Sequence, residues 1–119
     1  MMTMLKLLAT AALLAVGTAH AANLDAGKQK AQEVCQACHG MDGLSAASAE
    51  YPKLAGQYPD YLYAALKAYQ TDHNAVLGRS NAIMMGMARP FKHAEIKALA
   101  QYISTLPGDL KTVAQSRFR

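Results

Sequence analysis

Apolar side chains recur at the spacing of an α-helix in three parts of the chain. The first is residues 24–35, where Asp25 lies in the first turn and suits the helix dipole. A second helix is predicted to open at Tyr58-Pro59-Asp60, because proline is well tolerated at the first helical position. A third begins near His93 and ends before Pro107-Gly108. The apolar stripes of the last two are Leu62, Ala65, Leu66 and Tyr69, and Ile96, Leu99, Ala100 and Ile103.

Two long connections separate these helices, residues 40–57 and residues 71–89, and both are rich in small and polar residues. No segment alternates apolar and polar positions as a strand would, so the predicted fold class is all-α. Connections this long are unusual in a compact domain unless something functional orders them. The polar tail after Leu110 is expected to fray.

The first 21 residues have the pattern of a secretory leader. A short head with one cation precedes an apolar run at residues 7–16, and Ala19-His20-Ala21 places small residues where a signal peptidase reads them. The run is short for a bilayer span, although an uncleaved N-terminal anchor is the alternative. We therefore expect a signal peptide at residues 1–21 and one domain at residues 22–119. This domain would be periplasmic, with no transmembrane anchor after cleavage.

The charge of the chain argues against one broad class of function. The leader contains Lys6, one of the 12 basic residues, and none of the 8 acidic ones, so cleavage lowers the net charge from +4 to +3. The chain lacks the interleaved basic and aromatic stripe of nucleic-acid-binding proteins, and no nucleic-acid partner is expected. The small cationic excess at most favours docking on acidic protein surfaces or near anionic lipid headgroups.

Both cysteines of the chain lie in the run Cys35-Gln36-Ala37-Cys38-His39. A disulfide that closes so short a loop would constrain the unfolded chain very little. A thioredoxin-like redox pair would follow a strand, and no strand pattern precedes Cys35. Two thiols at this spacing can instead reach the two vinyl groups of one haem, and the next side chain is directed at the iron. We therefore interpret Cys35 and Cys38 as attachment points of one covalently bound haem c, and His39 as an iron ligand.

The second iron ligand is expected in the connection at residues 71–89, which contains Met84, Met85 and Met87. Thioether sulfur is the soft ligand of Met/His cytochromes, although any single Met can also fill a gap in a core. Met87 is nearest the third helix, where a methionine packs naturally in the core. Met85 would point away from its neighbour's target if the backbone were extended. The alternatives are His73 or His93, both expected to be solvated, or no sixth ligand.

These motifs resemble a class I cytochrome c, in particular the short bacterial type that is similar to one domain of the periplasmic dihaem cytochromes. The resemblance covers essentially the whole chain after the leader and implies three main helices with long loops wrapped around one covalently bound haem. The matching residues are Gly27, Cys35-Gln36-Ala37-Cys38-His39-Gly40 with Asp42-Gly43, Tyr51-Pro52-Lys53-Leu54-Ala55-Gly56-Gln57, Asn81-Ala82-Ile83-Met84-x-Gly86-Met87-Ala88 and Leu99-Ala100-x-Tyr102-Ile103.

The resemblance also implies roles for single residues. Met84, the first methionine of Met-x-Gly-Met, would be the axial ligand opposite His39. Pro52 would offer its carbonyl to the Nδ1–H of His39, which fixes the imidazole and raises its basicity. Gly27 would let the first helix cross closely against the last one near Tyr102.

Two residues depart from the family pattern. Lys92 stands where the family usually has Ser or Thr three residues before an acidic residue, here Glu95, so the capping box of the last helix lacks its first half. Met85 stands where the family often has a small residue.

Two protein ligands would leave no open position on the iron, so the haem would change only by one electron. The sequence therefore predicts an electron-transfer protein rather than an enzyme. We expect a soluble, monomeric carrier that docks on redox partner proteins with acidic surfaces. One alternative is a five-coordinate haem enzyme or gas-binding sensor, against which the methionine cluster and the early position of the haem motif argue. Another is a haem subunit dedicated to a dehydrogenase or oxidase complex.

Overall fold

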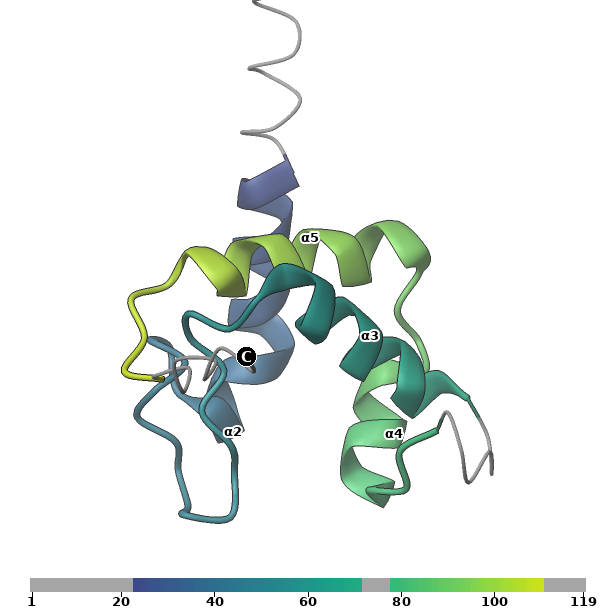
Figure 1. Ribbon diagram of the computed structural model, residues 1–119. Helices are drawn as coiled ribbons and strands as arrows, with labels where there is room; N and C mark the ends of the chain where they lie inside the picture. Colours follow the sequence, from purple (N-terminus) through teal and green to yellow (C-terminus); the bar gives the residue numbers. More distant parts are fainter. Residues whose placement is uncertain (1–22, 72–77, 111–119) are drawn as a thin grey trace, which may run out of the picture.

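A computed structural model describes residues 23–71 and 78–110, and the predicted leader, His73 and the polar tail lie outside these residues. The described part consists of helices and the loops that connect them and contains no strand, as predicted. None of its helices is both long and apolar enough to cross a membrane. Figure 1 shows α5 (His93–Thr105) lying along α3 (Pro59–Gln70), with α2 (Gln36–His39) and α4 (Ala82–Ala88) well apart on the other side of this pair.

The first helical segment runs without a break from residue 23 to His39, four residues beyond the predicted end. Its hydrogen bonding changes at η1 (Ala31–Cys35), a π-helical stretch in which the Gln36 N–H donates to the Ala31 carbonyl five residues back. Such stretches are rare and occur often at functional sites. The segment therefore reaches His39 as one continuous element, with η1 in its middle.

Gly27 lies where this first segment crosses α5. A Cβ at Gly27 would be 2.8 Å from the Cβ of Tyr102 and 2.7 Å from the carbonyl carbon of Ala98. Both distances are far below ordinary van der Waals contact. The close crossing that the sequence predicted at Gly27 and Tyr102 is therefore confirmed.

The apolar faces of α3 and α5 form the core. α3 begins with Pro59 after an extended Tyr58, and Asp60 lies in its first turn, as predicted. α5 ends where Leu106 becomes extended, just before Pro107. The buried core cluster consists of Ala31, Leu62, Leu99, Ala100 and Ile103, with Ile96 also fully buried. The stripes predicted on these two helices are thus the faces that pack.

The start of α5 carries half of a capping box. The Glu95 carboxylate accepts the backbone N–H of Lys92 at 2.8 Å, whereas the lysine side chain offers no acceptor in return. Glu95 also lies 3.2 Å from Lys30 Nζ, which ties the first helical segment to α5. The Lys92 N–H first, and then Lys30, lower the pKa of Glu95. The hydrogen bond to Glu95 is the main cause of the raised pKa of Lys30.

One expectation about the second connection is wrong, because residues 82–88 form the helix α4. Asn81 caps it, with its Oδ1 accepting the Met84 N–H at 2.9 Å. In a helix, side chains three apart share a face, so Met84 and Met87 lie on one face and Met85 is turned away from it. The backbone at Met85 is therefore helical, whereas the prediction for this residue assumed an extended chain. Met87 is 46% exposed and is not a core residue, contrary to expectation.

Candidate haem site

His39 is the buried histidine at the end of α2, with 6% of its surface exposed. Its Nδ1 lies 2.9 Å from the Pro52 carbonyl oxygen, which confirms the predicted contact. Because a carbonyl can only accept, Nδ1 carries the proton, and Nε2 is the nitrogen available to a metal. The bond fixes the orientation of the ring and raises the basicity of that nitrogen.

Gly40 turns the chain directly after His39. Its φ of 81° lies in the left-handed region that favours glycine. A Cβ at this position would lie 2.5 Å from the Ser45 carbonyl oxygen. The Gly40 N–H donates to the Gln36 carbonyl at 3.0 Å, which is the last hydrogen bond of this helix. The turn lets the chain leave the site and return with Pro52 beside the imidazole.

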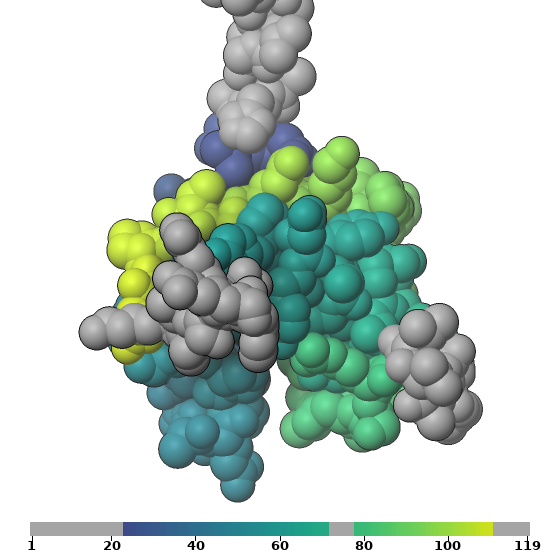
Figure 2. Space-filling model, viewed as in Figure 1, coloured from purple at the N-terminus to yellow at the C-terminus, as the bar shows by residue number. Residues whose placement is uncertain are grey.

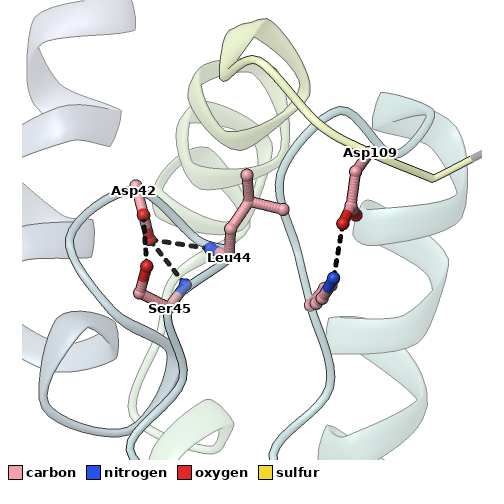
Figure 3. Close-up of polar contacts among 5 residues, drawn as sticks. Asp42, Leu44, Ser45 and Asp109 are labelled. Carbon is pink, nitrogen blue, oxygen red and sulfur yellow. Dashed lines mark hydrogen bonds and ion pairs between the residues drawn. The ribbon is translucent and has the colours of Figure 1, made fainter.

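Asp42 organises the loop that makes this return. Figure 3 shows its Oδ1 accepting the backbone N–H groups of Leu44 and Ser45, both at 2.8 Å, while Oδ2 accepts the Ser45 hydroxyl at 2.7 Å. These bonds stabilise the charged carboxylate. The Ser45 hydroxyl contributes most, and the pKa of Asp42 is lowered to about 2. Asp42 is among the residues that carry the family resemblance, but its role in ordering this loop was not predicted.

The same loop is then attached to the end of the fold. Lys53, the residue after Pro52, forms an ion pair with Asp109 (Figure 3). Ala55 is fully buried, and the Gly56 N–H donates to the carbonyl of Ile103 near the end of α5. The connection at residues 40–57 is therefore held by its own protein contacts on the side of the site that carries His39.

Cys35 and Cys38 lie on the same continuous helical segment as His39, one at the end of η1 and the other in α2. Both are half-buried free thiols. Burial first, and then the neighbouring Cys38, raise the pKa of Cys35 to about 11. Two free thiols and an imidazole with one nitrogen available are the groups that attach and ligate a c-type haem. The residues present therefore fit this cofactor.

A notch separates the two elements that carry the candidate iron ligands. The space-filling view in Figure 2 is hollowed between the blue segment that contains α2 and the green segment that contains α4. α2 ends in His39, and α4 carries Met84, which is half-buried. His93 lies at the start of α5 instead, where it is exposed and its Nδ1 is 3.0 Å from the hydroxyl of Tyr63. The expectation that His93 is solvated is thus confirmed.

Comparison with known proteins agrees with this geometry. The sequence model of the family described as "Cytochrome c" matches residues 24–107. The chain is 44% identical over 72 residues to the thiosulfate dehydrogenase electron acceptor of Thiomonas intermedia (strain K12), which covers 60% of this chain and 31% of that protein. It is 40% identical over 82 residues to cytochrome c4 of Thiocapsa roseopersicina, a match that covers 69% of this chain and 39% of that protein. A shorter relative, cytochrome c-554(548) of Halomonas halodenitrificans, is 38% identical over 71 residues, a match that covers 60% of this chain and 82% of that protein.

The chain belongs to the cytochrome c family, whose members are mostly electron-transfer proteins. A cytochrome c domain with this Cys-x-x-Cys-His spacing implies one covalently bound haem c, so the predicted cofactor is confirmed. The matched regions span only about a third of the length of the first two relatives, 31% and 39%.

Proposed function

We propose that this protein is a soluble, monomeric, periplasmic carrier of single electrons whose haem is ligated by His39 and Met84 and attached through Cys35 and Cys38. The observation that carries the proposal is the placement of the segment with α2, which ends in His39, and of the methionine helix α4 on the two sides of one notch. When bound, the haem supplies a centre that gains or loses one electron.

The residues on the two sides of the notch would have different roles in holding the haem. On one side, the Pro52 carbonyl holds the Nδ1 proton of His39, so the imidazole is oriented and cannot rotate freely. On the other side, α4 presents Met84 and Met87 on one face, and the family resemblance favours Met84 of the two. If His39 and Met84 both held the iron, oxygen and substrates would be excluded from it, which favours a carrier over an enzyme.

The location and the partners are part of the same proposal. The leader pattern at residues 1–21 supports export, and haem attachment to an exported chain is consistent with a periplasmic protein. The net charge of +3 after cleavage favours partners with acidic docking surfaces. One relative is described as an electron acceptor of thiosulfate dehydrogenase, and a dehydrogenase of that class is a reasonable first donor to test with this chain.

Three Met→Leu variants test the ligand assignment, because the exchange nearly conserves volume and costs less than about 1.5 kcal/mol in a core. The holoproteins of Met84→Leu, Met85→Leu and Met87→Leu would be compared by absorption spectra, midpoint potential and binding of carbon monoxide to the ferrous form. We expect only Met84→Leu to lose the methionine–iron charge-transfer band, to bind carbon monoxide readily and to show a much lower potential.

Two outcomes would contradict the proposal at different points. Loss of the band in Met87→Leu, with Met84→Leu unchanged, would move the ligand one turn along the same face of α4. Ready binding of carbon monoxide by the unmodified protein would instead place it among the five-coordinate haem proteins. Intact-mass measurement of periplasmic protein is the first step, and a chain that begins at Ala22 with one haem added is the expected species.

A further inference from the structure

The methionine helix α4 has little protein core of its own. It is seven residues long, and Ala88, a small side chain near its end, is its one residue that the protein buries. A helix this short is not stable by itself in water. Its position must therefore be set by the bonds that attach it to its neighbours, and α4 packs against α3, as Figure 1 shows.

A single side chain of α3 holds the C-terminal end of α4. The Nε2 of Gln70 donates to the Ala88 carbonyl at 2.8 Å and to the Phe91 carbonyl at 2.7 Å. Its Oε1 accepts from Lys67 Nζ at 2.8 Å, which sets the orientation of the amide. Both N–H groups and the oxygen of this partly buried amide are therefore satisfied. The two carbonyls belong to the end of α4 and to the turn that leads into α5, and the Ala88 carbonyl also accepts the Phe91 N–H at 3.1 Å.

The chain before α4 is attached to the same helix by Arg79. Its backbone N–H donates to the Ala68 carbonyl at 3.1 Å, and its Nη2 lies 3.1 Å from the Tyr61 hydroxyl. Its guanidinium carbon is 5.6 Å from the ring centroids of both Tyr61 and Tyr69, within the range of cation–π attraction. Removal of one attachment thus leaves the other in place, so the expected result is a loosened α4 rather than an unfolded protein.

We propose that Gln70 is a positioning residue, which holds α4 on α3 and thereby keeps the iron-binding sulfur of α4 at the metal. The inference rests on the proposed function, because it needs a methionine of α4 as ligand. It does not depend on which methionine binds, since Met84, Met85 and Met87 all lie within α4. Gln70 would act through the helix and would not touch the haem iron.

Imidazole is a suitable probe, because it can bind the ferric iron only where the protein sulfur has left. Its apparent affinity therefore reports the fraction of molecules in which the sulfur is detached. We expect the Gln70→Leu holoprotein to bind imidazole roughly tenfold more tightly, a factor that corresponds to about 1.4 kcal/mol and to the loss of one or two hydrogen bonds. Its midpoint potential should also fall.

Two further variants make the test specific. Gln70→Glu keeps the size of the side chain but, when ionised, can donate to neither carbonyl, so it should loosen the sulfur at least as much as Gln70→Leu. Gln29→Leu is the matched control, because Gln29 makes an exposed bond to Glu33 on the first helical segment and has no bond to α4. It should leave the imidazole affinity and the potential unchanged.

The results separate the two levels of inference. If both Gln70 variants melt at lower temperature while their imidazole affinity and potential match the unmodified protein, Gln70 has only a structural role and the inference fails. If they bind imidazole more tightly while Met84→Leu keeps its charge-transfer band, the role of Gln70 stands and the assignment of Met84 fails. If Met84→Leu loses the band and the Gln70 variants bind imidazole no more tightly, the assignment stands and the inference fails.

Discussion

The crossing of the first helical segment over α5 at Gly27 permits a quantitative prediction. In Gly27→Ala, the new Cβ would lie 2.8 Å from the Tyr102 Cβ and 2.7 Å from the Ala98 carbonyl carbon. Carbon atoms in contact are normally separated by about 3.5–4.0 Å, so the two helices must move apart by about 1 Å. One of the obstructing atoms belongs to the backbone of α5 and cannot be moved by a rotamer change.

The cost follows from two opposing effects. Overpacking of this kind costs about 1–3 kcal/mol, and the backbone contact at Ala98 places Gly27→Ala near the upper end. Alanine recovers about 0.5–1 kcal/mol, since glycine is a poor helix former. We therefore expect a net loss of about 2 kcal/mol in the free energy of unfolding. The Lys30–Glu95 ion pair at 3.2 Å joins the same two helices and should be weakened as well.

Guanidinium unfolding of the holoprotein, followed by far-UV circular dichroism, measures this loss. The control is Ala26→Gly, because Ala26 is the exposed neighbour on the same helix and reports the propensity effect alone. That variant should lose about 0.5–1 kcal/mol. A Gly27→Ala protein as stable as the unmodified one, or more stable, would refute the steric reasoning.

Three further changes test other parts of the structure. His39→Ala should give no holoprotein or one with high-spin iron, and a normal low-spin absorption spectrum would show that another residue is the proximal ligand. Asp42→Asn should be less stable than the unmodified protein at neutral pH. Because the folded pKa of Asp42 is lowered from 3.8 to about 2, this difference should persist above pH 4 and disappear as the pH falls towards 2, and a pH-independent difference in urea unfolding would contradict it. Lys92→Ser should complete the capping box and stabilise α5 by about 1 kcal/mol, which thermal unfolding would detect, whereas an unchanged melting temperature would show that the cap is not limiting.

Much of the fold could be predicted because its helices follow simple rules. The buried faces of α3 and α5 are marked by strict apolar spacing, and Pro59 marks one of their boundaries. The contact of Pro52 with His39 and the crossing at Gly27 were predicted through family resemblance, since nothing in their local sequence identifies a partner so far along the chain.

The helix α4 was missed for a physical reason. It is too short to show an apolar period, and Gly86 near its middle reads as a loop residue. A usable signal was nevertheless present, because Asn81 is a good N-cap and the four residues after it are compatible with a helix. The attachment by Gln70 could not have been predicted, because its amide donates to two backbone carbonyls. Every residue has such a carbonyl, so the sequence does not identify the partners.

The π-helical stretch η1 has a consequence for how the chain can vary in length. A helix has 3.6 residues per turn, so each inserted or deleted residue rotates everything beyond it by about 100°. Gly27 faces α5 before η1, and Cys35, Cys38 and His39 of the attachment motif lie at or beyond the end of η1. A π-helical turn contains about one residue more than an α-helical turn, so deletion of a single residue within η1 would restore ordinary helical bonding and keep the attachment motif in register with Gly27. Loss of one residue can therefore be accommodated within these five residues, whereas the same loss in the α-helical residues between Gly27 and η1 would rotate the attachment motif relative to α5.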